Sequence, residues 1–251
     1  MTRSPAHKPS RPFPLHTGLA QVVRVAPASP RMACITLTAP QFAELGVEEP
    51  GEIITLGWAA PGEELVLPQL GWRFPPGKRE QHWRNFTVRR QRPDRAEIDV
   101  EFFLHGDRGP AARWAARAAP GDEVGFAGPR VHWESNGGSD WSLLVADETG
   151  LPALLAILES LPQGHRALAL AEVSGAEERR EVETAADVEL RWLTRRGALA
   201  ETVGELELPW GRGHVWGGGE SQAMRAVRDH VRRRARVDTV HVLGYWSRLR
   251  D

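Results

Sequence analysis

The 251-residue sequence has little cysteine, little lysine and no long apolar run. Cys34 is the only cysteine, which excludes an intramolecular disulfide framework and a thiolate metal cluster. Lys8 and Lys78 are the only lysines, so nearly every cation is an arginine, a residue suited to bidentate contacts with phosphate or carboxylate, although a GC-rich genome would give the same bias. No apolar run approaches the ~18 residues of a membrane span, and no signal-peptide core is present. We therefore expect a cytoplasmic protein with no membrane partner.

Charge of one sign is also missing. The 32 basic and 33 acidic residues give a formal net charge of −1, so no global field attracts nucleic acid. Six arginines between Arg225 and Arg236 make one helical stretch basic, but that stretch lacks an aromatic platform for stacking bases. We interpret it as a solvated helix face, and the sequence predicts no nucleic-acid partner.

The pattern predicts two domains of different class. Residues 1–15 are rich in proline and read as a flexible arm. Residues 16–134 contain short β-rich segments bounded by Pro and Gly, which is typical of a β-sandwich or an antiparallel β-barrel. One helix is expected at Gly109–Ala118, because Pro110 suits a first helical turn. The expected strands are Val22–Val25, Met32–Leu37, Ile53–Leu56, Asn85–Arg89, Ile98–Leu104 and Glu123–Ala127.

A polar, Gly-rich linker is expected at residues 135–140, followed by a second domain over residues 141–251. There, apolar strands alternate with helical stretches, which predicts an α/β domain with a parallel sheet. The expected strands are Ser142–Ala146, Arg166–Val173, Val188–Leu193, Gly213–Trp216 and Thr239–Leu243, and the expected helices are Leu151–Leu161, Leu199–Leu206 and Glu220–Ala235. Because open parallel sheets bind ligands beyond the carboxyl ends of their strands, the turns at residues 147–150 and 217–220 are candidate ligand sites.

Five blocks of sequence resemble one family. They are Arg84-Asn85-Phe86-Thr87-Val88-Arg89; Phe103-Leu104-His105-Gly106 with Gly109-Pro110-Ala111; Pro120-Gly121-Asp122 with Gly128-Pro129; Asp147 to Ala153; and Gly218-Gly219-Glu220 with Tyr245-Trp246. In this order they resemble the siderophore-interacting proteins, FAD-dependent ferric-siderophore reductases related to ferredoxin reductases. The resemblance implies that the barrel binds FAD and that the α/β domain binds a nicotinamide nucleotide, NAD(P)H.

The resemblance also implies FAD contacts in the barrel. Arg84 and Arg89 would meet phosphate, and Thr87 would address the edge of the isoalloxazine ring. Phe86 replaces the family's usual Tyr, which keeps the ring and deletes a hydroxyl. The start of the expected helix would hold the pyrophosphate. The remaining barrel residues predicted to bind the cofactor are Leu104, His105, Gly109, Pro110, Ala111 and Ala112.

In the α/β domain the resemblance implies a site at the junction with the flavin. Asp147, Glu148 and Thr149 would line it, and Tyr245 and Trp246 would lie near the isoalloxazine ring. Gly218, Gly219 and Glu220 would form a strand-to-helix turn that lets a dinucleotide approach the backbone closely.

The implied activity is reduction of a ferric siderophore with release of Fe(II), with NAD(P)H or a ferredoxin as electron donor. No protein metal site is expected, because the siderophore itself holds the iron. Arg130 and Arg248 are the candidates for a cationic ledge that attracts the anionic chelate. A general flavin or electron-transfer reductase, and a flavin- or siderophore-binding protein without turnover, stay open as alternatives.

Overall fold

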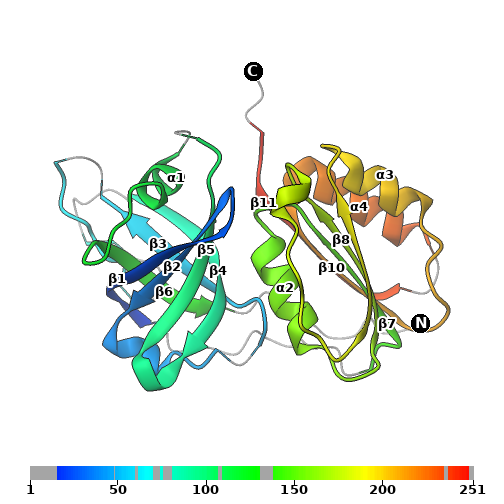
Figure 1. Cartoon of the computed structure of the whole chain (residues 1–251), viewed down its shortest axis with the longest axis horizontal. Helices are drawn as coiled ribbons and strands as arrows, with labels where there is room; N and C mark the ends of the chain where they lie inside the picture. Colours follow the sequence, from blue (N-terminus) through cyan, green and yellow to red (C-terminus); the bar gives the residue numbers. More distant parts are fainter. Residues whose placement is uncertain are drawn as a thin grey trace.

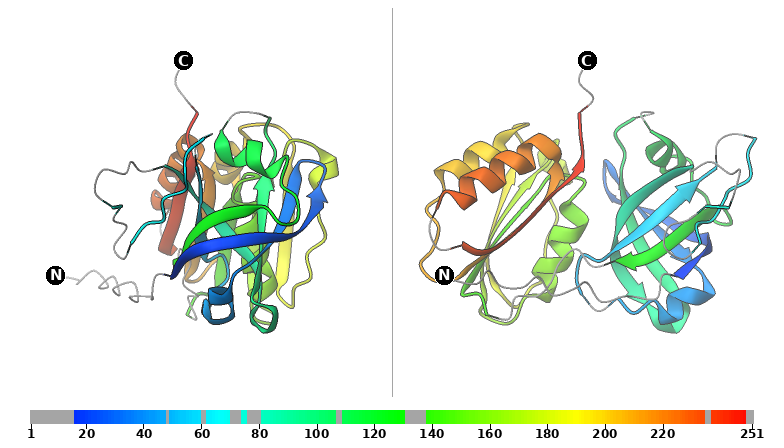
Figure 2. Two further views of the ribbon diagram at one scale, coloured as in Figure 1. Left: turned by 90° about the vertical axis from the view of Figure 1, so that its left-hand side faces the viewer. Right: turned by 180° about the vertical axis from the view of Figure 1, so that it is seen from behind.

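The computed structural model describes residues 16–47, 49–59, 62–69, 74–75, 81–106, 109–130, 138–234 and 237–248. Two bodies lie side by side, a barrel and a sheet flanked by helices, and Figures 1 and 2 show them from three sides. The predicted arm, residues 1–15, lies outside the described residues, as do residues 135–137 of the predicted linker.

The first body is an antiparallel barrel, as predicted; it is closed, and its strand order is β1-β2-β5-β4-β3-β6. Its core holds the inward-facing side chains of all six strands, among them Ile35, Leu56 and Phe126, each fully buried. The elements are β1 (His16–Ser29), β2 (Met32–Thr38), η1 (Pro40–Glu44), β3 (Ile53–Trp58), β4 (His82–Arg92), η2 (Pro93–Arg95), β5 (Glu97–Phe103), α1 (Pro110–Ala115) and β6 (Glu123–Arg130).

The second body is a five-stranded parallel sheet, again as predicted, and its strand order is β11-β10-β7-β8-β9. Helix α2 covers one face, and α3 and α4 cover the other (Figure 1). The elements are β7 (Trp141–Ala146), α2 (Leu151–Ser160), β8 (Arg166–Glu172), η3 (Ala176–Glu178), β9 (Asp187–Leu193), α3 (Ala198–Glu205), β10 (Gly213–Glu220), α4 (Ser221–Arg232) and β11 (Val237–Trp246). Among the helices described, none has the length and apolar character needed to cross a bilayer.

Several elements end where the sequence did not place them. Helix α1 is six residues long, not ten, and α4 begins at Ser221. Residues 217–219 belong to strand β10, not to a turn, because they continue the parallel ladder with β11. Tyr245 and Trp246 likewise end strand β11 and do not form a separate tail.

Charged side chains join the two bodies. Arg89 of β4 donates to Glu159 of α2, with Nη1 2.7 Å from Oε2. Glu101 of β5 accepts two hydrogen bonds from Nη1 of Arg180, at 2.8 and 2.9 Å. Near the β1–β2 turn, the hydroxyl of Ser29 donates to Glu178. These contacts fix the α/β domain against β4 and β5, the strands that carry much of the candidate site.

Candidate functional site

A pocket of about 830 Å³ lies where the two bodies meet. Its size falls in the range of small-molecule and cofactor sites. Its wall contains β3, β4, β5, α1 and the end of β6 on the barrel side, and the β7–α2 turn and the end of β11 on the other. The lining residues are Ile53, Thr55, Trp83, Arg84, Asn85, Phe86, Thr87, Glu101, Phe102, Phe103, His105, Gly109, Pro110, Ala111, Ala112, Arg130, Glu148, Thr149, Pro152, Leu243, Gly244, Tyr245, Trp246 and Ser247.

The barrel side of the pocket carries a polar cluster around Arg130. Nη2 of Arg130 donates to Thr55 Oγ1 and to Asn85 Oδ1, each at 2.7 Å. Thr55 in turn donates to Asn85 Oδ1 at 2.8 Å. Arg84, one strand position before Asn85, is exposed and donates through Nη1 to the carbonyl of Trp83. This side therefore presents two guanidinium groups and two hydroxyls, Thr55 and Thr87, to whatever fills the pocket.

Aromatic rings make up much of the remaining wall. Phe86 packs against Phe102 with ring centroids 4.4 Å apart, and Phe103 lies 5.9 Å from His105. From the other body, the ring of Tyr245 lines the pocket with its hydroxyl buried and without a hydrogen-bond partner among the described residues. Burial and the charge of Asp147 raise the pKa of the Tyr245 phenol, which favours the neutral form. A flat apolar wall with an orphaned polar atom fits a ring system with polar edges.

On the α/β side, Asp147 organises the turn after β7. Oδ1 accepts from the backbone N–H of Thr149 at 2.8 Å, from its hydroxyl at 2.6 Å and from the N–H of Gly150 at 3.4 Å. Oδ2 accepts from the N–H of Glu220 and from Nε1 of Trp246, both at 2.8 Å. Asp147 is buried behind the pocket wall and does not line it, so it positions the residues that do.

Glu148 is half-buried and does line the pocket. Burial raises the pKa of its carboxyl, and the charges of Asp147 and Glu172 raise it further, while hydrogen bonds from its own backbone N–H and from Ser174 act in the opposite direction. The site thus contains a carboxyl group that takes up a proton more readily than an exposed glutamate.

The glycines predicted to approach a dinucleotide serve the protein's own packing. A Cβ on Gly218 would lie 2.8 Å from the ring of Tyr245, and one on Gly219 would lie 2.8 Å from the carboxylate of Asp147. Glu220 is the N-cap of α4, where its carboxylate accepts from the N–H groups of Gln222 and Ala223. These three residues lie off the pocket wall, and their predicted contact with a dinucleotide stays a prediction.

Three further predicted residues, all in the described part of the chain, also lie off the wall. Arg89 forms an ion pair with Glu159, and its predicted phosphate contact stays a prediction. Leu104 packs against the barrel core. Arg248 is exposed, with its backbone N–H 3.5 Å from Glu220 Oε1. The structure brings the remaining predicted residues together, apart from the buried Asp147.

Sequence reasoning missed several lining residues. Thr55 is the one polar residue in the buried strand β3, which was a readable signal. Glu101 alternates with Asp99 on β5, but its facing partner Arg180 is too distant in sequence to be inferred. The unassigned lining residues are Ile53, Thr55, Trp83, Asn85, Glu101, Phe102, Phe103, Pro152, Leu243, Gly244 and Ser247.

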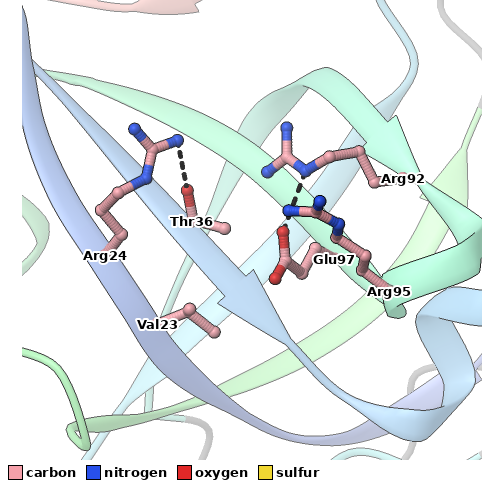
Figure 3. Close-up of a pocket in the computed structure, with 6 residues that line it drawn as sticks. All are labelled: Val23, Arg24, Thr36, Arg92, Arg95 and Glu97. Carbon is pink, nitrogen blue, oxygen red and sulfur yellow. Dashed lines mark hydrogen bonds and ion pairs between the residues drawn. The ribbon is translucent and has the colours of Figure 1, made fainter.

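A second hollow, of about 450 Å³, lies on the outside of the barrel and is lined by β1, β2, β4 and β5 (Figure 3). Arg24 donates to Thr36 there at 3.3 Å. Arg92 is paired with Glu97 and, through two hydrogen bonds, with Asp99. Carboxylates therefore pair with Arg92, whereas Arg24 contacts a hydroxyl and the exposed Arg95 adds a third guanidinium group to this hollow.

Comparisons with known proteins agree with this picture. The family model "Siderophore-interacting FAD-binding domain" matches residues 21–133, and the model "Siderophore-interacting protein" matches residues 139–249. A siderophore utilization protein from T. fusca, solved as a crystal structure, superposes with a TM-score of 0.84 at 33% identity and 95% coverage of both chains.

Among curated proteins, the ferric vibriobactin reductase of Vibrio cholerae is 28% identical over 174 residues, which cover 66% of this chain and 64% of the relative. The NADPH-dependent ferric-chelate reductase of Escherichia coli is 43% identical over 67 residues, 27% of this chain and 26% of the relative. The matched part of the chain therefore spans less than two thirds of the length of these curated relatives.

Proposed function

Since this chain belongs to the siderophore-interacting protein family, we propose that it reduces ferric siderophores with FAD as its cofactor. The observation that carries the proposal is the interdomain pocket, where two arginines and two hydroxyls face aromatic rings. FAD has an apolar tricycle with polar edges and a doubly charged pyrophosphate, so this donor set fits it.

The barrel residues would hold the cofactor. Arg84 provides charge-assisted hydrogen bonds that a pyrophosphate needs, and Thr55, Thr87 and Asn85 provide polar contacts beside it. Gly109, Ala111 and Ala112 contribute backbone N–H groups at the start of α1, and Phe86 contributes a ring face. Leu104 and Arg89 support these residues from behind without facing the pocket.

The cofactor supplies the redox chemistry. When bound, FAD would supply two-electron uptake from a donor and one-electron delivery, which matches the reduction of Fe(III) to Fe(II). The chain's own groups keep one side of the site apolar and leave Trp246, 37% exposed, at its opening. NAD(P)H is the proposed donor, supported by the matched segment of a relative named NADPH-dependent, with a ferredoxin as the alternative.

The iron chelate is the substrate, and we place its approach at Arg130 and Arg248. Arg130 lines the pocket at the end of β6, and Arg248 follows β11, whose last residues Tyr245 and Trp246 line the pocket. Burial lowers the pKa of Arg130, but a guanidinium group stays charged at physiological pH. A cationic rim attracts anionic chelates and accelerates their encounter.

The deciding experiment is anaerobic. The purified protein should be yellow and release FAD on denaturation, bleach on addition of NADPH or NADH, and recover its colour with a ferric siderophore while Fe(II) is trapped by a chromogenic chelator. Bleaching with no reoxidation by any ferric chelate would favour the alternative of a general flavin reductase. A protein that fails to bind added FAD contradicts the proposal altogether.

Variants test the rim. Arg130→Gln and Arg248→Gln should slow reoxidation by the chelate several-fold, and the wild-type reaction should slow as salt rises, since long-range attraction is screened. Arg95→Gln is the matched control, because Arg95 is equally exposed and lies at the far outer hollow of the barrel. If all three variants changed the rate of reoxidation equally, the assignment of Arg130 and Arg248 to chelate binding would be wrong.

A further inference from the structure

The carboxyl edge of the parallel sheet is the place where a dinucleotide should bind. Strands β8 and β9 lie on one side of β7, and β10 and β11 lie on the other. The order in which strands are added to the sheet therefore reverses next to β7. At such a switch point, the turn after the first strand and the N-terminus of the following helix usually hold the pyrophosphate. In this protein that turn is residues 147–150 and the helix is α2.

The backbone donors of this turn are already used by the chain itself. The N–H of Glu148 bonds its own carboxylate, and that of Thr149 bonds Asp147 Oδ1. The N–H groups of Gly150 and Leu151 bond the carbonyl of Asp147 at 3.1 and 2.9 Å. Pro152 has no N–H to offer. The start of α2 therefore lacks the open donors that make a helix N-terminus an anion site.

The next helix on the same edge is closed in a similar way. Glu220 caps α4 with Oε2, which accepts from the N–H groups of Gln222 and Ala223 at 2.8 and 2.9 Å. Its carboxylate occupies the position where the helix dipole would stabilise a bound phosphate. The starts of α2 and α4 thus carry a carboxylate of the chain in place of a ligand anion.

Glu148 adds a third carboxylate and is the one that faces the pocket. Asp147 behind it accepts five hydrogen bonds, and Glu172 of β8 is held by the N–H groups of Gly197 and Leu199. Glu148 has no comparable set of fixed donors from neighbouring residues. We propose that Glu148 sets the affinity of this protein for a nicotinamide dinucleotide and keeps it low by repelling the pyrophosphate. This inference rests on the proposed function and specifies its donor site.

The repulsion depends on the charge of Glu148, and so on pH. The charged and titratable groups around it are Asp147 and Glu172 from its own domain, with Arg84, Glu101, His105, Arg130 and Tyr245 elsewhere on the pocket wall. Because the pKa of Glu148 is raised, its negative charge is lost at a higher pH than that of an exposed glutamate. Dinucleotide affinity should therefore rise as the pH falls.

Binding of ADP-ribose tests the inference without turnover. This ligand has the pyrophosphate but no nicotinamide ring, and saturating FAD keeps it out of the cofactor site. At pH 8, Glu148→Gln should bind ADP-ribose about three- to tenfold more tightly than the wild type, the effect of removing one unit charge ~6 Å from one or two phosphate charges. Toward pH 5.5 the wild type should approach the variant, whose affinity should change less.

Glu207→Gln is the matched control, since Glu207 is exposed on the connection that leads to the amino end of β10. It removes the same charge at the opposite edge of the sheet and should leave the affinity unchanged. Equal affinities of the wild type and Glu148→Gln at pH 8, or no binding by either, would overturn the inference. Reduction of ferric chelates by light-reduced flavin uses no donor, so that assay reports separately on the proposed function.

Discussion

The two sides of the pocket are built from opposite charges. The barrel side presents Arg84 and Arg130, whose guanidinium groups face the pocket, whereas the α/β side presents Glu148 in front of Asp147. The barrel suits an anionic cofactor held for long periods. The α/β side suits a partner that binds and leaves, because its own carboxylates occupy the positions where phosphates would be retained. Under the proposed function, this difference would let the pocket bind the cofactor tightly and the electron donor weakly.

The largest expected effect is at the junction that holds the two sides together. Arg89 has only 8% of its side chain exposed and pairs with Glu159 and, at 3.6 Å, with Glu101. Arg89→Met leaves the Glu159 carboxylate without this partner and Glu101 with Arg180, and should lower the free energy of unfolding by about 3 kcal/mol, measured by urea denaturation of the FAD-free protein.

The exposed pair of Arg191 with Glu189 serves as the control, and Arg191→Met should cost about 1 kcal/mol or less. If Arg89 acted on the cofactor instead, Arg89→Met would weaken FAD binding and leave the stability of the FAD-free protein unchanged.

The next effect probes how tightly the α/β side is packed. A Cβ on Gly150 would lie 2.1 Å from the carbonyl oxygen of Gly218. At this position the backbone of the β7–α2 turn packs directly against the backbone of β10. Gly150→Ala should cost about 1–3 kcal/mol of stability, as overpacking of a fixed interior does, and thermal unfolding would measure it.

Gly204→Ala is the comparison variant in helix α3. The nearest atoms to its Cβ would belong to the side chain of His230, at 3.2 Å. Alanine also has a higher helix propensity than glycine. This substitution should leave stability unchanged or raise it slightly. A similar loss in both variants would contradict the backbone contact.

The smallest effect concerns the hydrogen bond from Trp246 to Asp147. Trp246→Phe removes the Nε1 donor, while four other donors continue to satisfy the carboxylate. We expect a loss of about 1 kcal/mol in urea denaturation, since Trp246 is partly exposed. A loss as large as that of Arg89→Met would show that Asp147 depends on this one donor.

The sequence predicted the architecture well because the signals for it are local. Short apolar runs bounded by Pro and Gly predicted the barrel, and the change to alternating strands and helices predicted the parallel sheet. Element ends were less accurate. Strand β1 extends from His16 to Ser29, well beyond the four residues predicted, because pairing with β2 and β6 supports residues of weak strand preference.

The site was only partly predictable, because contacts distant in sequence decide what each residue does. Arg84 and Arg89 lie on the same strand, yet one faces the pocket and the other pairs with a glutamate 70 positions away. Gly218 illustrates the same limit of sequence analysis. Its missing side chain predicts that another group approaches the backbone closely, and the structure shows that the ring of Tyr245 does so.

The closure of the barrel has a consequence for how the protein forms during synthesis. Strand β1 pairs along its first half with β6, more than a hundred residues later, so the barrel cannot close until the last barrel strand has left the ribosome. Contacts of such sequence separation fold slowly. The parallel sheet, in contrast, is built from neighbouring β–α units and follows on the chain. We therefore expect the α/β domain to acquire its secondary structure quickly, while barrel closure limits the rate at which the complete pocket appears.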